Sequence, residues 1–341
     1  MTEKNTAAEL PETMRALVVG HGSTWKLVER DVPRPGAGEV LVRVHAAASN
    51  NGDIPMIDGA DPAAGGNGEE AVAGFEYAGE IAATGDGVST WSIGDPVMGS
   101  MPSAYADYVL VDARFPMPRP ATITPVEAAT LPVGLLTEHG ALVAANFVKG
   151  RSVLVTGASS GVGLVGAQVA KAVGASTVIG TTRRESMRQV LTDHGVDEVI
   201  VTDGNDLAER VLALTEDGVD VVLEHLGSPA FAQSVETTAQ EGHLVPVGRA
   251  AGSEASINLD RIGQRRLAIR GVSFGFTRLQ EMADVVAGLL PEVIPAVERG
   301  EIRAVVDSTY DVTDHEKVVE RLRSGENTGK VVMTFVDSRP R

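Results

Sequence analysis

The chain of 341 residues contains no cysteine. This absence excludes disulfide bonds, a thiolate nucleophile, and zinc or iron–sulfur sites that rely on cysteine ligands. Aromatic residues make up only 4% of the sequence, whereas 38 glycines raise the glycine content above the usual share. Such a composition predicts many tight turns around a core of small aliphatic side chains.

The chain also has few positively charged residues. It contains 29 Lys and Arg but 46 Asp and Glu, which gives a formal net charge of −17. This charge repels phosphate backbones and anionic lipids, so we expect neither nucleic acid nor a membrane as a partner. No long apolar run is present, and residues 1–13 are polar, without the apolar segment of a secretion signal. We therefore expect a cytoplasmic protein with a flexible arm at residues 1–13.

Two patterns divide the rest of the chain. From residue 14, short apolar segments such as 40–44 are separated by Gly-Asp and Pro-Gly turns, which predicts antiparallel strands. The Gly-, Ala- and Pro-rich stretch 58–72 is expected to form a loop over a cleft. From about residue 151, buried strands alternate with helices, and six strands predict a doubly wound parallel sheet. One long helix after residue 277 and the strands that follow it are expected to complete the first domain.

Segment 161–166 matches the pattern G-x-G-x-x-G directly after a predicted strand and at the start of a helix. In this setting Gly161 permits the turn, Gly163 admits a pyrophosphate, and Gly166 lets the helix pack on the strand. Amides at the helix N-terminus then face the anion. A turn that serves packing alone is the alternative, but the surrounding strands favour a dinucleotide site. Its expected contacts are Ser159, Ser160, Gly161, Val162 and Gly163.

The end of the second parallel strand distinguishes between the two nicotinamide dinucleotides, because an NAD site places an acidic residue there. Here Thr182 and Glu185 have the spacing of a capping box, which gives Glu185 a structural role. Arg183 and Arg184 would then lie in the first helical turn, where the macrodipole disfavours cations. A 2′-phosphate would offset that cost, so we expect NADPH. Two solvated surface arginines are the alternative.

Seven short motifs resemble those of the medium-chain dehydrogenase/reductase superfamily, in its zinc-independent quinone oxidoreductase branch, which includes zeta-crystallin. The resemblance extends from residue 14 to residue 335. The matching elements are Pro35-Gly36-x-Gly38-Glu39-Val40-Leu41-Val42, Asn50-x-x-Asp53, Gly74-x-Glu76-x-x-Gly79, Gly94-Asp95-x-Val97, Ala128-Ala129-x-Leu131-Pro132, Ala158-x-x-Gly161-Val162-Gly163 and Gly329-Lys330-Val331-Val332.

The resemblance implies an α/β protein with a GroES-like catalytic β domain at 14–137 and 280–341, a Rossmann NADP-binding domain at 138–279, and a homodimer. Zinc-dependent relatives carry a Cys-His pair where this chain has Asn50 and Asn51, and a histidine where it has Phe75. Neither asparagine nor phenylalanine is a plausible zinc ligand. We therefore expect no catalytic metal.

Several site residues follow from the resemblance. Asn50 would lie beside the nicotinamide ribose and donate to the substrate oxygen, although a loop Asx-turn is an equal alternative. Thr137 would touch the nicotinamide amide, or else cap a helix. The further expected cofactor contacts are Thr182, Arg183, Arg184, Thr202, Val247, Gly248, Phe274 and Asn327. His139 and His225, each preceded by glutamate, are proton-relay candidates, but we interpret both as structural.

These features predict an NADPH-dependent enzyme that transfers hydride to a small-molecule quinone or α,β-unsaturated carbonyl. Without a Lewis acid, such an acceptor needs only hydrogen-bond donors for the developing enolate or phenolate, and a proton. The family's tyrosine after the Asn-x-x-Asp motif is missing, since Pro55 stands near that position. This departure favours the alternative of a non-catalytic NADPH-binding protein, and a zinc-free alcohol or ketone oxidoreductase is the second alternative.

Overall fold

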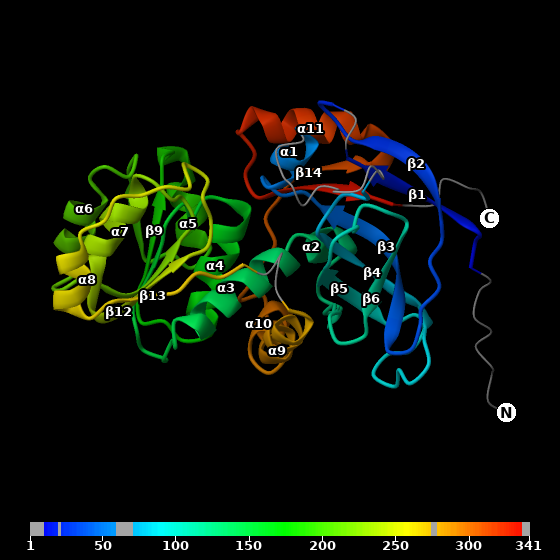
Figure 1. Ribbon diagram of the computed structural model, residues 1–341, viewed down its shortest axis with the longest axis horizontal. Helices are drawn as coiled ribbons and strands as arrows, with labels where there is room; N and C mark the ends of the chain where they lie inside the picture. Colours follow the sequence, from blue (N-terminus) through cyan, green and yellow to red (C-terminus); the bar gives the residue numbers. More distant parts are fainter. Residues whose placement is uncertain (1–9, 20–21, 59–70, 274–277, 336–341) are drawn as a thin grey trace. The chain divides into compact units, whose positions relative to one another are not determined.

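The computed structural model describes residues 10–19, 22–58, 71–273 and 278–335. Residues 59–70, most of the loop expected over a cleft, and residues 1–9 of the expected arm lie outside them. The chain divides into two compact units, Met1–Val133 with Ala304–Arg341, and Gly134–Arg303. Figure 1 shows the first unit in blue, cyan and red, and the second in green, yellow and orange.

The first unit is built mainly on antiparallel strands, and its β14 and β15 pair in parallel. A seven-stranded sheet has the order β14–β15–β3–β4–β5–β7, with β6 also paired to β3, and β1 and β2 form a separate pair. The strands are β1 (Thr13–Val18), β2 (Lys26–Asp31), β3 (Glu39–Ala48), β4 (Glu76–Thr84), β5 (Pro96–Ser100), β6 (Tyr108–Asp112), β7 (Met117–Pro118), β14 (Val306–Asp311) and β15 (Lys330–Thr334). The helices are α1 (Asp53–Ile57), α2 (Pro125–Ala129) and α11 (His315–Ser324).

Small residues let the strands of this sheet approach closely. A Cβ added at Gly79 of β4 would lie 1.9 Å from the carbonyl oxygen of Arg43 in β3. β15 joins the same sheet, because Val332 pairs with Ala48 in antiparallel register. The end of the chain thereby brings Lys330 beside the end of β3, which forms one part of the candidate site described below.

The second unit contains the predicted doubly wound sheet. Its six strands are all parallel, in the order β10–β9–β8–β11–β12–β13, which confirms the Rossmann arrangement. The strands are β8 (Val153–Val155), β9 (Val178–Thr182), β10 (Glu198–Val201), β11 (Val219–Glu224), β12 (Thr238–Pro246) and β13 (Ala268–Ile269). All three residues of β8 are buried, as a sheet covered on both faces requires.

Helices lie on both sides of this sheet (Figure 1). The helices that follow the first unit along the chain are α3 (Pro132–Ala144), α4 (Gly161–Ala172), α5 (Arg188–Asp193), α6 (Leu207–Leu214), α7 (Ala230–Thr237), α8 (Leu259–Arg265), α9 (Leu279–Leu289) and α10 (Val293–Glu298), of which α9 and α10 do not lie on the sheet. No helix in the described ranges is long and apolar enough to cross a membrane.

The segment after residue 277 differs from the expectation of one long helix. α9 ends at Leu289 and α10 begins at Val293, with Pro291 between them. Proline cannot donate a helical hydrogen bond and its ring clashes with the preceding turn, so the helix is interrupted there. α10 packs against α4, and the compact units accordingly divide at residue 304, whereas the sequence pattern placed the return to the first domain at residue 280.

Candidate active site and dinucleotide site

The glycine-rich loop of the second unit connects β8 to α4. Ser160 is the N-cap of α4, and its hydroxyl accepts a hydrogen bond of 3.0 Å from the amide of Gly163. The amides of Gly161 and Val162 open the helix, and neither has an acceptor among the described residues. Because α4 is 12 residues long, these two amides and the helix dipole form a site suited to a phosphate.

Two glycines of the motif are required by packing. A Cβ at Gly163 would lie 2.7 Å from the carbonyl oxygen of Gly157, so only glycine allows the loop to fold against the start of α4. A Cβ at Gly166 would lie 2.6 Å from the Oε2 atom of Glu138. Gly166 was expected to make room for a strand, but the nearest atoms belong to a carboxylate of α3.

Thr182 ends β9 beside the loop. Its hydroxyl donates to the hydroxyl of Ser159 at 3.0 Å and accepts from the amide of Arg184 at 3.2 Å. The predicted capping box is absent, because Glu185 forms an ion pair of 2.6 Å with Arg188 in the short 3₁₀ turn Glu185–Met187. Arg183 and Arg184 therefore precede the helix rather than occupy its first turn. Arg183 is exposed and Arg184 is half-buried.

The other expected cofactor residues of this unit follow the ends of two strands, β10 and β12, which three other strands separate. Thr202 comes directly after β10 and forms a turn, accepting from the amide of Gly204 at 2.9 Å and donating to Asp206. The amides of Val247 and Gly248, after β12, donate to the carbonyl oxygen of Glu224 at 2.7 and 3.0 Å. Because the strands are parallel, these ends meet at one edge of the sheet, where doubly wound folds bind ligands.

Three expected residues lie elsewhere. Phe274 lies outside the described residues. Thr137 is half-buried within α3, which begins at Pro132, so it does not cap that helix. Asn327 belongs to the first unit, where its side-chain amide donates to the carbonyl oxygen of Gly329 at 2.9 Å.

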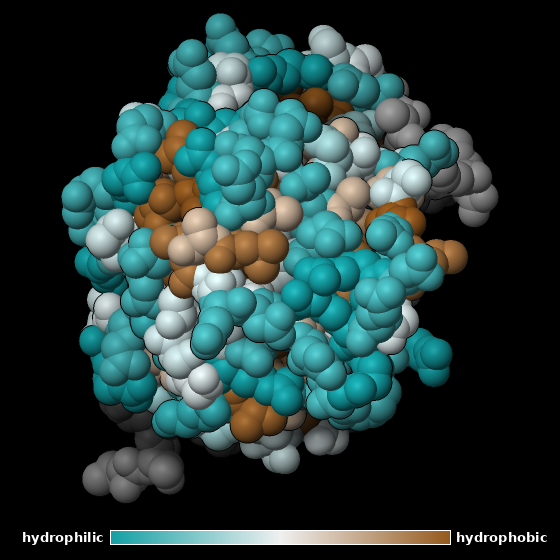
Figure 2. All heavy atoms as spheres, turned by 90° about the vertical axis from the view of Figure 1, so that its left-hand side faces the viewer, coloured by the Kyte–Doolittle hydropathy of each residue, from teal (hydrophilic) through white to brown (hydrophobic). Residues whose placement is uncertain are grey.

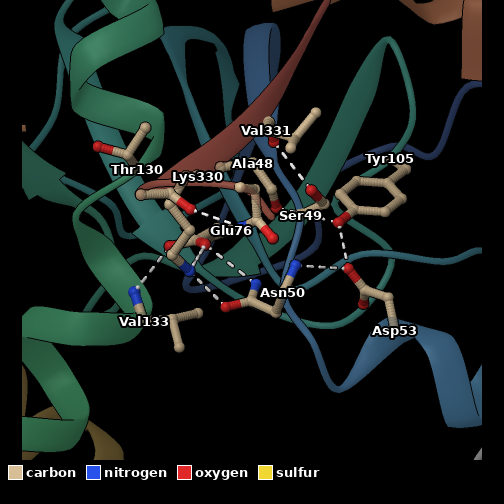
Figure 3. Close-up of polar contacts among 12 residues, drawn as sticks. Ala48, Ser49, Asn50, Asp53, Glu76, Tyr105, Thr130, Val133, Lys330 and Val331 are labelled. Atoms are coloured by element: carbon tan, nitrogen blue, oxygen red, sulfur yellow. Dashed lines mark hydrogen bonds and ion pairs between the residues drawn. The ribbon is translucent and has the colours of Figure 1, made fainter. Parts of the chain in front are cut away.

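A buried charge cluster lies at the end of β3 in the first unit (Figure 3). Glu76 is fully buried, and its Oε1 atom accepts from the Lys330 ammonium at 2.6 Å and from the Asn50 side-chain amide at 3.0 Å. Its Oε2 atom accepts from the amide of Val133 at 3.0 Å. Lys330 also donates to the Oδ1 atom of Asn50. The Asn50 side chain is therefore not held in an Asx-turn, but lies between a carboxylate and an ammonium group.

Asp53 and Tyr105 extend this cluster. The Oδ2 atom of Asp53 accepts from the amide of Asn50 at 2.8 Å and lies 2.6 Å from the Tyr105 hydroxyl, which is also 3.0 Å from the carbonyl oxygen of Ala48. Burial raises the pKa of Asp53 to about 6, against the opposing effect of these hydrogen bonds and of Lys330. A protonated Asp53 carboxyl group would donate to the Tyr105 hydroxyl oxygen, and the single hydroxyl proton of Tyr105 could then bond the carbonyl oxygen of Ala48.

Gly74 explains why the Tyr105 ring lies so close to the backbone just before β4. Its φ is +92°, and a Cβ would lie 2.2 Å from the ring of Tyr105. Tyr105 is fully buried. What the sequence does not reveal is its contact with Asp53.

The residues that replace the zinc ligands hold no alternative metal centre. No group of three or more His, Asp or Glu suited to a metal ion occurs within the described ranges. The carboxylate of Glu76 is instead neutralised by the Lys330 ammonium. The cluster therefore contains a neutralised ion pair, beside which the Asn50 side-chain amide lies as a hydrogen-bond donor.

A second buried charge pair lies in the second unit. The His225 ring contacts the Glu138 carboxylate at 2.6 Å, and both residues are buried. Sequence reasoning considered His225 without identifying its partner, because Glu138 lies 87 positions earlier on a different element. The only signal was an acidic residue at an otherwise apolar helix position.

Two family models match the chain. Residues 36–121 match the alcohol dehydrogenase GroES-like domain, and residues 161–288 match the zinc-binding dehydrogenase domain. The two matches cover both units, in the order that the resemblance predicted. The chain belongs to the medium-chain dehydrogenase/reductase superfamily.

The relatives of this chain include a quinone oxidoreductase and two proteins that are named for other functions. Rat quinone oxidoreductase is 29% identical, over 96% of this chain and 99% of the relative. Acryloyl-coenzyme A reductase of Metallosphaera sedula is 28% identical, over 94% of this chain and 100% of the relative. A Mycobacterium tuberculosis polyketide synthase subunit for phenolphthiocerol and phthiocerol is 29% identical over 89% of this chain, but the chain spans only 14% of its length.

A solved structure agrees with these relatives. The mycobacterial protein Rv1454c, complexed with NADPH, has a TM-score of 0.80 and 28% identity, over 94% of this chain and all of that chain. The medium-chain dehydrogenase/reductase fold and the quinone oxidoreductase-like branch are thereby confirmed.

Proposed function

We propose that this protein is an NADPH-dependent, zinc-independent reductase of quinones or α,β-unsaturated carbonyl compounds. The observation that carries the proposal is the N-terminus of α4, where two amides without acceptors follow a glycine-rich loop. The first unit supplements it with a cluster in which Asn50 stands where zinc-dependent relatives carry a ligand and is held by Glu76 and Lys330.

The residues of the second unit fit NADPH. The amides of Gly161 and Val162, with the Ser159 and Ser160 hydroxyls, would hold the pyrophosphate. Arg183 and Arg184, at the end of β9, would bind the 2′-phosphate through charge-assisted hydrogen bonds. The NADPH complex of a mycobacterial neighbour supports this assignment. Thr202, Val247 and Gly248 would complete the cofactor contacts at the same edge, with Phe274 and Asn327 as further proposed contacts.

The bound nicotinamide would supply the hydride. The task of this chain's residues is then to orient the acceptor and to stabilise the oxygen on which charge develops. We assign that role to Asn50, whose side-chain amide has two N–H donors, one of which bonds Glu76. Lys330 lies against Asn50 and holds its amide oriented by binding its carbonyl oxygen. Thr137 is assigned to the nicotinamide amide.

The relatives support an electron-poor conjugated acceptor. Two of them are named for a quinone and for acryloyl-coenzyme A, and both match over nearly their whole length. Both substrates accept hydride at a carbon conjugated to a carbonyl group, which requires less activation than an isolated ketone. We also propose that two copies of the chain associate.

The proposal is tested by following NADPH oxidation with a benzoquinone, with 2-cyclohexenone and with a simple aldehyde, in the presence of EDTA. We expect turnover of the quinone or the enone, and loss of about 10²-fold in kcat for Asn50→Ala, as for removal of one oxyanion donor. Asn51→Ala, the next residue, serves as the matched control. Turnover of the aldehyde alone would favour the alcohol or ketone oxidoreductase. Tight NADPH binding without any turnover would favour a binding protein.

A further inference from the structure

The pair Glu138–His225 is buried beneath the glycine-rich loop, where apolar packing would be the usual solution. The Glu138 side chain is fully buried, and His225 has 7% of its surface exposed. The ring Nδ1–H donates to the carbonyl oxygen of Thr156 at 2.8 Å, which fixes the proton on Nδ1. Nε2 then faces the Oε1 atom of Glu138 at 2.6 Å, so a second ring proton is needed to join them.

The pair connects three elements that form the cofactor edge of the sheet. Glu138 belongs to α3, His225 follows β11, and Thr156 precedes the loop that leads to α4. The Thr156 hydroxyl accepts from the amide of His225 at 2.8 Å and donates to the Glu224 carboxylate at 3.1 Å. Glu224 also accepts from the amides of Leu226 and Gly227, both at 2.9 Å.

Three glycines allow the backbone to pack directly against the Glu138–His225 pair. Gly166 of α4 leaves the space that the Glu138 carboxylate fills, and the Oε2 atom of Glu138 has no hydrogen-bond partner among the described residues. Gly157, with a φ of +60°, lies against the side chains of Leu226 and His225. A Cβ at Gly248 would lie 2.4 Å from the carbonyl oxygen of His225. The pair is therefore packed closely against the backbone of Gly157, of α4 and of the turn after β12.

We infer that Glu138 and His225 are positioning residues for the dinucleotide site, and that an imidazolium–carboxylate pair holds the glycine-rich loop in its binding conformation. This inference rests on the proposed function, since it concerns the same cofactor. When His225 loses its second proton, the Nε2 lone pair faces a carboxylate oxygen and the hydrogen bond is lost. The loop is then released, and the affinity for the dinucleotide falls as pH rises.

The surroundings of His225 favour its charged form. Glu138 on α3 and Glu224 on β11 are the titratable groups that face it in the described part of the chain, while α4 and the loop after β12 contribute glycines. Desolvation alone would lower the pKa of His225, but the two carboxylates outweigh it and the pKa is raised. The pair is therefore charged at low pH and is lost as pH rises through this raised value.

The test measures the Kd for NADPH and for NADH from pH 6 to pH 9, by cofactor fluorescence. NADH is included because the 2′-phosphate of NADPH titrates near pH 6. For the wild type we expect Kd for both to rise about tenfold across this range, equal to about 1.4 kcal/mol. Glu138→Gln should bind without a pH step, because its amide can accept from the imidazolium or donate to the neutral ring. His225→Leu should bind weakly throughout.

His139→Gln is the matched control, since it removes a half-buried histidine from the same helix but not the pair. Nitrogen NMR of His225 adds a readout that does not depend on cofactor: both ring nitrogens should carry protons at pH 6, and one proton should be lost as pH rises. Binding that is indifferent to pH and to both variants would overturn this inference alone. Failure of the wild type to bind either dinucleotide at any pH would overturn the proposed function as well.

Discussion

Replacing Asp53 by asparagine should remove a pH-dependent loss of stability. Burial raises the pKa of Asp53 from 3.8 to about 6, so the folded protein binds this proton more tightly than the unfolded chain. The stability gained from that proton is fully present below the unfolded pKa and is lost as pH rises through about 6. The whole effect amounts to about 3 kcal/mol, of which about 1.4 kcal/mol falls between pH 5 and pH 8.

The variant mimics the protonated carboxyl group. Because Oδ2 makes both contacts, the asparagine carbonyl oxygen at that position can accept from the amide of Asn50 and from the Tyr105 hydroxyl, without a buried charge. We therefore expect Asp53→Asn to be at least as stable as the wild type at pH 8, with a flatter dependence of the unfolding free energy on pH.

Urea unfolding at several pH values between 5 and 8 measures this difference. Asp58→Asn is the control, because Asp58 is exposed and the neighbouring Arg323 lowers its pKa, the opposite direction. The reasoning is refuted if the unfolding free energies of the wild type and Asp53→Asn differ by a constant amount across this range. It is also refuted if the variant is the less stable protein at every pH.

Two further predictions concern the second unit. The double variant Arg183→Ala/Arg184→Ala should weaken NADPH binding by about 10²-fold and leave NADH binding unchanged, because two charge-assisted hydrogen bonds to the 2′-phosphate are lost. Fluorescence titration measures both affinities. Equal losses for the two cofactors would contradict the 2′-phosphate assignment. The outer strand β13 ends the sheet with Ile269 partly exposed, and hydrophobic patches are present on the face in Figure 2. Sedimentation equilibrium should give twice the 35.5 kDa chain mass. Ile269→Lys should shift the measured mass towards that of the monomer, because a charge on an edge strand opposes its pairing with the edge strand of a second copy. A monomeric wild type would exclude the dimer.

The sequence was sufficient to predict the fold of the second unit, because its strands are nearly continuous apolar runs and its glycine loop stands between a strand and a helix. Local rules failed where a single residue decided the outcome. Pro291 divides the helix expected after residue 277, and Glu185 pairs with Arg188 rather than capping a helix with Thr182. Glu185 lies three residues from both Thr182 and Arg188, so its position fits either a capping box or an ion pair, and the structure contains the ion pair.

The site was predicted as individual residues but not as clusters. Asn50, Glu76 and Lys330 all belong to recognised motifs, yet their spacing does not show that they share one buried network. The pairing of Glu138 with His225 is equally hidden, because an α-helix and a strand end 87 positions away must first be brought together. Buried contacts of this kind depend on tertiary packing, which periodicity does not report.

Hydride transfer is the central claim, and deuterium transfer tests it most directly. The enzyme, treated with EDTA, would be given NADPH carrying deuterium at C4 of the nicotinamide and an enone such as 2-cyclohexenone, and the product analysed by mass spectrometry and NMR. We predict one deuterium at the carbon β to the carbonyl, with undiminished turnover after metal removal. Turnover that is abolished by EDTA and restored by zinc, or a product without deuterium, would contradict the account.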